Sequence, residues 1–406
     1  LTIVGKIKYM LDNNLIKPNE VCAITYTNKA ANSLKEKIKK ETKQNIDTYT
    51  FHKLSLKILD KANIKYDIVT DELLDSIIDK YFEIDIINNK ILLKIIFNYF
   101  NYYIFKTMNN YNKILNSKEF IEFKKVIKSF IGYINSNDLS YKWNYLLTNK
   151  KHKKILLIIY NLYTSYLNEL NSSNYLDFDY MIKLANKVID DDIVKLSYKL
   201  IIIDEFQDTS KLKLNLIKSI VNKNNSSLCV VGDDYQSIYR FQGCNLSLFL
   251  NFNKYFSNVK TYFLNETFRN SQELIDVAGF FVQKNTNQIQ KNLISKKRLY
   301  KPIKIIYYNN SYNILIKLIS NIDVNKKILI LSRNNNDINK YLKEYELNDS
   351  KLYIKGIKHN ITYLTIHSSK GLECEIVIVL NMLDDIFGMP CKLKDNDIIS
   401  LLKEKE

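Results

Sequence analysis

Hydrophobic residues in the first part of the chain alternate between helical and strand-like spacing. The opening segment LTIVGKIKYML has apolar residues at helical spacing, and this stripe stops before Pro18. The short β-rich run VCAITYT (21–27) leads into NKAANSLKEKIKK, which places Ala and Leu on one helical face. The segment IDTYTFHKLSLKIL (46–59) repeats the order of strand and helix. This alternation predicts an α/β domain.

The spacing changes from residue 66 to residue 175. This stretch has one glycine and no proline, and Ile, Leu, Lys, Tyr and Phe recur in it at helical spacing. We predict a helical subdomain here, inserted into a first α/β domain made of residues 1–65 and 176–260. In the second part of that domain, KLIIIDEFQDTS and SLCVVGDDYQSIY are short apolar runs that end in polar clusters. Such runs are typical of parallel strands buried on both faces.

A second α/β domain is predicted for residues 261–406. Its expected strands are KIIYY (304–308), KILILSRNN and CEIVIVLNML. The predicted fold class is therefore α/β, with two parallel-sheet domains and one helical insertion.

The composition favours a polyanionic partner. The chain has 406 residues and a formal net charge of +17, which makes nucleic acid the first candidate. A lysine-rich solvated surface is the alternative explanation, because Lys and Asn are spread along the whole chain. The five cysteines form no CxxC pair, so we expect reduced thiols in a reducing, cytoplasmic compartment. No apolar run reaches the roughly 18 residues that cross a bilayer, and we expect no membrane association.

Paired carboxylates follow the buried run LIII in KLIIIDEFQDTS (199–210). In open α/β sheets, ligands bind outside the carboxyl ends of the strands. Two adjacent like charges at such a place, Asp204 and Glu205, need a cation, and Mg²⁺ with a nucleotide phosphate supplies one. The alternative is helix capping, because Asp208, Thr209 and Ser210 suit a helix N-terminus. Capping does not explain the acidic pair itself.

A second strand end carries amide and aromatic groups. In VVGDDYQSIYRFQG (230–243), Gly232 lets the backbone turn, and Gln236 could reach a γ-phosphate or its attacking water. Tyr239, Arg240 and Phe241 form a cationic and aromatic cluster of the kind that stacks nucleobases. A core position is the alternative for Tyr239. Phe268 and Arg269 of LNETFRNS (264–271) form another aromatic–arginine pair, for which a surface arginine is the default reading.

These stretches resemble, in order, the motifs of the UvrD/Rep-like DNA helicases of superfamily one. AITYTNKAANSLKEKI is similar to motif Ia, TYTFHKL to motif Ib, IIIDEFQDTS to motif II and VVGDDYQSIYRFQG to motif III. LNETFRNS resembles motif IV, and TIHSSKGLECEIVIV (365–379) resembles motif V. The resemblance implies two RecA-like domains of the P-loop NTPase type, with ATP and Mg²⁺ as cofactors and with single-stranded DNA and single-strand/duplex junctions as partners.

The resemblance also implies roles for individual residues. Asp204 would hold Mg²⁺, and Glu205 would activate the attacking water. Gln236 and Arg269 would meet the γ-phosphate, Phe268 would stack on adenine, and Gly371 and Glu373 would complete the ATP site, with Glu373 on the ribose. The residues that would line the single-strand path are Thr25, Thr27, Asn28, His52, Tyr239, Phe241, His367 and Lys370. A satisfied structural histidine is the alternative for His52 and His367, and a solvated side chain is the alternative for Lys370.

The sequence departs from the family pattern in three places. It contains no G-x-x-x-x-G-K-[ST] phosphate loop and lacks the family's final arginine motif, so we expect a fragment truncated at both ends. The helical insertion that the family carries before motif V is reduced or absent. The predicted function is an ATP-dependent 3′-to-5′ DNA helicase or translocase in DNA repair or replication, with the phosphate loop missing from this chain. The alternatives are a single-strand-binding module without ATPase activity and the motor part of a helicase–nuclease.

Overall fold

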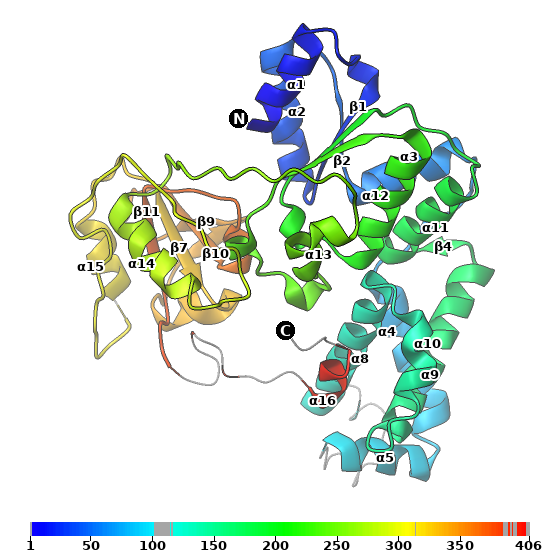
Figure 1. Cartoon of the computed structure of the whole chain (residues 1–406). Coiled ribbons are helices and arrows are strands. Elements are labelled where there is room, and N and C mark those ends of the chain that lie inside the picture. The colour runs from blue at the N-terminus through cyan, green and yellow to red at the C-terminus, as the bar shows by residue number, and fades with distance from the viewer. Residues whose placement is uncertain are drawn as a thin grey trace. The chain divides into compact units, whose positions relative to one another are not determined.

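The computed structural model describes residues 2–100, 114, 117–312, 314–384, 389, 392 and 396–402, and only the backbone of Phe241. The chain divides into two compact units. The first contains Leu1–Val259 and Asn396–Glu406, and the second contains Lys260–Asp395. Each unit has its own sheet and its own hydrophobic core (Figure 1).

A parallel four-stranded sheet, in the order β2-β1-β5-β6, forms the centre of the first unit. Its strands are β1 (Val21–Thr25), β2 (Asp47–Thr50), β5 (Leu200–Ile203) and β6 (Ser227–Val230). The register pairs Thr25 with Thr50, and Ile203 with both Ile24 and Val230. All four strands therefore end at the same edge of the sheet, as the apolar runs with polar ends predicted.

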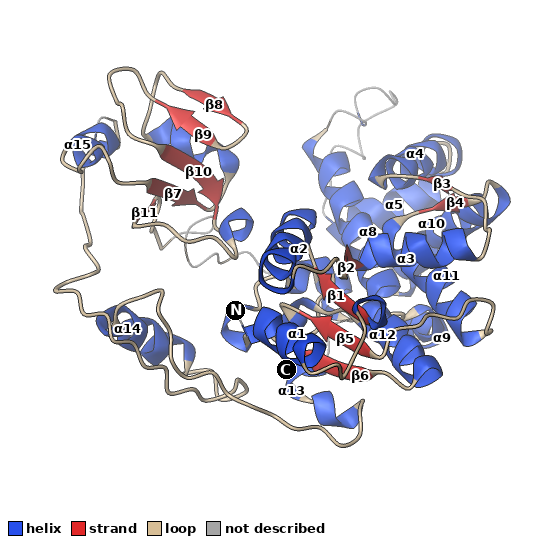
Figure 2. Ribbon diagram, turned by 90° about the horizontal axis from the view of Figure 1, so that it is seen from above, coloured by secondary structure: helices blue, strands red, loops and turns tan. Residues whose placement is uncertain are grey.

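Helices cover both faces of this sheet (Figure 2). Alternate residues of β1 and β5 pack against α1 (Thr2–Asp12) and α2 (Asn28–Thr42) on one face. The residues between them pack on the other face against α3 (Phe51–Lys61), α11 (Phe178–Asp190) and α12 (Lys211–Asn224). Burial on both sides explains why LIII is apolar at every position. The predicted α/β class is confirmed.

A second group of helices in this unit lies between two very short strands. β3 (Asp67–Ile68) pairs in parallel with β4 (Tyr175–Leu176), an interaction too short for the sequence pattern to reveal. The α-helices described between them are α4 (Asp71–Tyr81), α5 (Lys90–Phe100), α8 (Lys118–Ser136), α9 (Trp143–Leu146) and α10 (Lys153–Ser172). Isoleucine, leucine and aromatic side chains share their core, with the Phe82 and Phe120 centroids 4.6 Å apart. The short helix α16 (Asp397–Ser400) packs against α8, so this segment clusters with the first unit, although residues 261–406 were expected to form one domain.

The second unit contains a five-stranded mixed sheet in the order β11-β7-β10-β9-β8. The strands β10 (Ile361–Thr365) and β11 (Ile376–Val379) run parallel to β7 (Ile328–Ser332). The hairpin of β8 (Glu346–Asn348) and β9 (Lys351–Tyr353) adds antiparallel to β10. The unit also contains the helices α14 (Gln272–Val282) and α15 (Ile314–Ser320).

The prediction of a strand at KIIYY (304–308) is wrong. These residues form no strand, and Ile305 and Tyr307 are 75% and 90% exposed. An apolar run becomes a strand only when another strand pairs with it and a core covers one face, and in the structure the described residues supply neither here. The other two runs predicted in this unit do contain strands, namely β7 and β11.

Candidate functional site

The acidic pair lies directly after β5, at the edge where the strands of the first sheet end. The backbone N–H of Asp204 still donates to the Ile24 carbonyl at 3.0 Å, so Asp204 is held beside the end of β1. Glu205 turns the chain away with a left-handed φ of 55°, a conformation that costs free energy in a residue with a side chain. Its N–H donates to the Asp204 carboxylate at 3.1 Å. The local backbone therefore fixes both acids side by side.

The electrostatics of this pair suit a divalent cation. Burial raises the pKa of Asp204, and the neighbouring charge of Glu205 raises it further. A bound cation would offset both effects. Within the described ranges, no group of three or more His, Cys, Asp and Glu side chains is placed to hold a metal ion. The two carboxylates fit Mg²⁺, which is commonly held by one or two protein carboxylates, with water and substrate phosphate completing its shell.

The polar residues after the pair make contacts besides helix capping. Ser210 occupies the N-cap position of α12, but its side chain makes no capping hydrogen bond in the structure. The Thr209 hydroxyl is bonded to the hydroxyl of Tyr26, directly after β1. The Asp208 carbonyl accepts from the thiol of Cys244 at 3.0 Å. These contacts tie the segment to the end of β1 and to the loop after β6.

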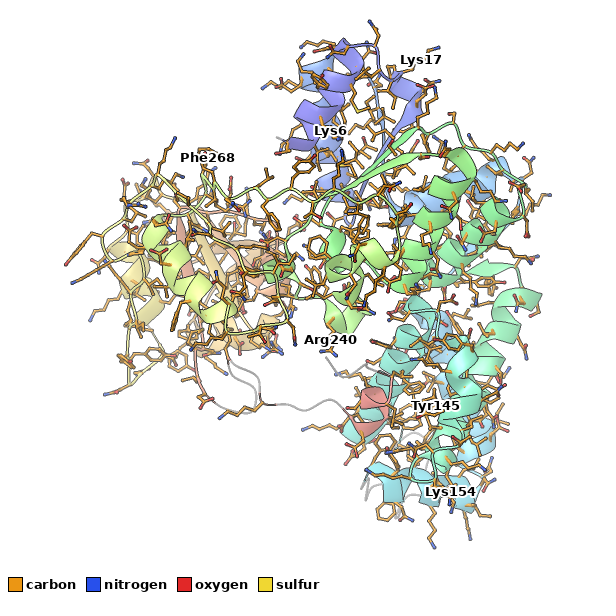
Figure 3. The ribbon with its side chains drawn as sticks, viewed as in Figure 1. Lys6, Lys17, Tyr145, Lys154, Arg240 and Phe268 are labelled. Carbon is orange, nitrogen blue, oxygen red and sulfur yellow. The ribbon has the colours of Figure 1, made fainter. Side chains whose placement is uncertain are left out.

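The loop after β6 places Gln236 in a defined network. Its side-chain amide donates to the Asp233 carboxylate at 2.8 Å, and the other oxygen of that carboxylate accepts from the Tyr235 N–H at 3.1 Å. Further along the loop, Tyr239 is half-buried, and burial raises its pKa. Arg240 is exposed, and Figure 3 shows its side chain extending from the ribbon. The predicted base-stacking ring of Phe241 lies outside the described side chains.

Gln207 is a site residue that the sequence analysis did not identify. Its side chain is fully buried. Its amide donates to a carboxylate oxygen of Glu205 at 2.6 Å, and its oxygen accepts from the Asp233 N–H at 3.0 Å. It thereby joins the two strand ends that the sequence analysis treated separately. The sequence signal for this role was a glutamine two positions after Glu205. That signal is weak, because an exposed turn at the same place could carry any polar residue.

The predicted DNA-path residues of the first unit cluster near the ends of β1 and β2. Thr25 is buried, and its hydroxyl donates to the Thr27 carbonyl at 3.2 Å. Thr27 caps α2 by accepting from the Ala30 N–H at 3.1 Å, and exposed Asn28 begins that helix. These contacts give both threonines local structural roles. Because the Thr27 hydroxyl oxygen accepts the capping hydrogen bond, a DNA contact by this hydroxyl would use its O–H as the donor.

His52 packs against the ring of Phe178, and the charge of Lys213 acts on it. Its ring centroid lies 4.9 Å from that of Phe178. Burial, and then the charge of Lys213, lower the pKa of His52 to about 4. His52 is therefore neutral at pH 7. Any interaction with a nucleic acid would use its ring face or a neutral hydrogen bond, and not a positive charge.

The second unit brings two of its predicted site residues together. The Arg269 side chain pairs with Glu373 at 3.1 Å, although 104 residues separate them in the chain. Phe268 is 69% exposed, and Figure 3 shows it at the surface. Gly371, with a φ of 80°, provides the left-handed turn just before Glu373. These residues thus form one local surface of the second unit.

His367 and Lys370 lie in the turn between β10 and β11. Burial lowers the pKa of His367, and the charge of Arg333 lowers it further. Lys370 is partly exposed, and its backbone N–H donates to the His367 carbonyl at 3.4 Å.

Four of the five cysteines are described, and they are free thiols. Among the described helices, none combines the length and the apolarity that crossing a bilayer requires.

A parallel sheet with paired acids after a buried central strand defines the first unit as a RecA-like α/β domain. Comparison with known proteins agrees with this class. Residues 1–257 match the family described as the UvrD/REP helicase N-terminal domain, and the chain belongs to that family.

Three relatives illustrate the match. The chain is 28% identical over 313 residues to a probable DNA helicase II homolog of Mycoplasma capricolum, covering 74% of this chain and 40% of the relative. It is 29% identical over 332 residues to the ATP-dependent DNA helicase Rep of Buchnera aphidicola, covering 79% and 46%. It is 27% identical over 323 residues to the ATP-dependent DNA helicase PcrA of Bacillus subtilis, covering 75% and 38%. The chain therefore spans less than half the length of these relatives.

Proposed function

We propose that this chain belongs to an ATP-dependent DNA helicase that moves 3′ to 5′ along single-stranded DNA, in the cytoplasm, in DNA repair or replication. The observation that carries the proposal is the fixed geometry of Asp204 and Glu205 after β5, with Gln236 joined to them through partly buried hydrogen bonds. The relatives named Rep and PcrA are ATP-dependent DNA helicases, which supports the same activity here.

The proposed mechanism assigns separate roles to the two acids. Asp204 would hold Mg²⁺, which would neutralise charge on the ATP phosphates. Glu205 would orient the attacking water and accept its proton. Gln236 would contact the γ-phosphate or that water through its amide. From the second unit, Arg269 would contribute positive charge to the γ-phosphate, Phe268 would stack on adenine, and Gly371 and Glu373 would complete the nucleotide site.

Single-stranded DNA is the proposed partner of the polar and aromatic residues at the strand ends. A net charge of +17 favours phosphate binding, and aromatic side chains such as Tyr239 and Phe241 can stack on bases without reading their sequence. Thr25, Thr27, Asn28 and His52 would line the strand in the first unit, and His367 and Lys370 would line it in the second. Contacts to single-strand/duplex junctions belong to the same proposal.

The test is DNA-stimulated ATP hydrolysis by the product of the complete reading frame. Glu205→Gln keeps the shape of the side chain and removes the proton acceptor, so we expect kcat to fall at least about a hundredfold. Binding of a fluorescent oligonucleotide should persist and should weaken as salt rises. Glu122→Gln is the matched control, because it makes the same charge change at an exposed position of α8.

Three outcomes would count against parts of this proposal. If Glu205→Gln hydrolyses ATP at the wild-type rate, the assignment of the proton acceptor is wrong. If the wild-type protein binds single strands but hydrolyses no ATP, the non-enzymatic binding module becomes the better description. Binding that does not respond to salt would contradict both.

A further inference from the structure

The side-chain amide of Gln207 makes hydrogen bonds within the protein through both its nitrogen and its oxygen. Gln207 follows Glu205 by two residues, and its side chain is fully buried. Its Nε2 donates to Glu205 Oε2 at 2.6 Å, and its Oε1 accepts from the Asp233 N–H at 3.0 Å. A carboxylate only accepts and a backbone N–H only donates, so these two partners fix which way the amide faces.

Gly232 makes room for this arrangement. A Cβ at position 232 would lie 2.7 Å from Gln207 Oε1 and 2.9 Å from Cε2 of the Phe249 ring. The backbone N of Gln207 would be 3.2 Å away. Any side chain at this position would therefore displace the amide or the loop. The glycine after β6 is explained here by close approach of the two strand ends, and the turn alone does not require it.

Asp233 extends the connection to the proposed phosphate-sensing residue. The Asp233 N–H is bonded to Gln207, and the Asp233 carboxylate accepts from Gln236 Nε2 at 2.8 Å. A continuous hydrogen-bonded path therefore runs from Glu205 through Gln207 and Asp233 to Gln236. This path gives a route by which movement of Gln236 can reach Glu205.

We propose that Gln207 is a positioning residue that holds the Glu205 carboxylate and links its orientation to Gln236. This inference rests on the proposed ATPase function and deepens it. By occupying Oε2, the amide leaves Oε1 of Glu205 to face the attacking water. A rearrangement of Gln236 around the γ-phosphate would reach Glu205 through the same path, so that the proton acceptor is aligned when nucleotide is bound.

The test compares substitutions at position 207 in the product of the complete reading frame. Gln207→Glu is nearly isosteric and, as a carboxylate, cannot donate to Glu205, and Gln207→Ala removes both bonds. We expect kcat for DNA-stimulated ATP hydrolysis to fall by about ten- to a hundredfold, as expected for loss of a hydrogen bond to a charged group. KM for ATP and affinity for single-stranded DNA should change less than about twofold, because only the alignment of the acceptor is lost.

The separation of kcat from DNA affinity and melting temperature distinguishes positioning from a general loss of structure. Both variants should lower kcat selectively, whereas a loss of structure would lower kcat, DNA affinity and melting temperature together. Gly232→Ala should produce the same pattern from the other side of the contact. Gln44→Ala, an exposed glutamine in the loop before β2, is the matched control and should leave all readouts unchanged.

The outcomes distinguish this inference from the proposed function. Wild-type protein without ATP hydrolysis would overturn the proposed function, and the role of Gln207 with it. Active wild type together with normal kcat in Gln207→Glu and Gln207→Ala would overturn only the positioning role. A parallel fall of kcat and DNA affinity, with a lower melting temperature, would assign Gln207 to fold stability and would also overturn it.

Discussion

Replacing Gly243 with alanine should loosen the loop after β6 from helix α8. Gly243 has a φ of 83°, a left-handed conformation that suits glycine. A Cβ at this position would lie 2.0 Å from Ser136 Oγ and 2.9 Å from Ser136 Cβ. The Gly243 carbonyl accepts from Asn137 Nδ2 at 3.1 Å, so the loop cannot move away without losing that bond. The substitution thus combines backbone strain with a collision.

The magnitude follows from these two contributions. The left-handed backbone costs about 1–2 kcal/mol for a residue with a Cβ. Inserting a methyl group into a filled contact costs about 1–3 kcal/mol. Gly243→Ala should therefore lower the free energy of unfolding by about 2–5 kcal/mol, a large share of the stability of an ordinary domain. Adding Ser136→Gly to Gly243→Ala should recover the free energy lost to the steric clash, and the cost of the left-handed backbone should remain.

Urea unfolding followed by Trp143 fluorescence measures this effect, because the single tryptophan is buried in the core formed by α8 and its neighbouring helices. Gly132→Ala is the control on α8. It meets no atom within 4 Å, so it should stabilise the helix by about 0.5–1 kcal/mol. If Gly243→Ala unfolds at the wild-type urea concentration, or if Ser136→Gly restores nothing, the close contact between the loop and α8 is refuted.

Two pH-dependent predictions concern residues near the proposed DNA path. The pKa of His52 is lowered to about 4 from an unfolded value of about 6.5, so the unfolded chain takes up its proton first, and stability should fall as pH drops through that window. His52→Asn should remove up to about 3 kcal/mol of this fall. If the urea midpoint of His52→Asn differs from that of wild type by the same amount at pH 5 and at pH 7, the reasoning is contradicted. Burial, and then the charge of Asp177, raise the pKa of Asp179 to about 7, so its contribution to stability is lost as pH rises from about 4 to 7. Asp179→Asn should therefore raise the melting temperature at pH 8 and change it little at pH 4, whereas an equal change at both would count against the shift.

The first sheet was predictable because its chemistry is local. A strand covered by helices on both faces must be apolar at every position, which VCAIT and LIII satisfy, and the acids after LIII could only face the sheet edge. KIIYY has the same local character but has neither a pairing strand nor a core among the described residues. Sequence pattern reports the tendency to form a strand, and tertiary pairing decides whether the strand forms.

The connections within the site were much less predictable. Asp204 and Glu205 stand out as adjacent charges, but Gln207 acquires its role only because Gly232 brings a second strand end within hydrogen-bonding distance. The pairing of Arg269 with Glu373 likewise depends on how the chain folds between them. Contacts of this kind are set by the packing of the domain, and no spacing rule along the chain contains them.

The register of β1 and β5 would have a thermodynamic consequence for the proposed DNA motor. The segment proposed to touch DNA leaves β1 at Thr25, and the Asp204 N–H is bonded to the preceding residue of that strand, Ile24. If ATP and DNA bind at these neighbouring strand ends as proposed, linkage requires any effect of one on the affinity for the other to be mutual. Whatever factor ATP imposed on affinity for DNA, DNA would impose the same factor on affinity for ATP.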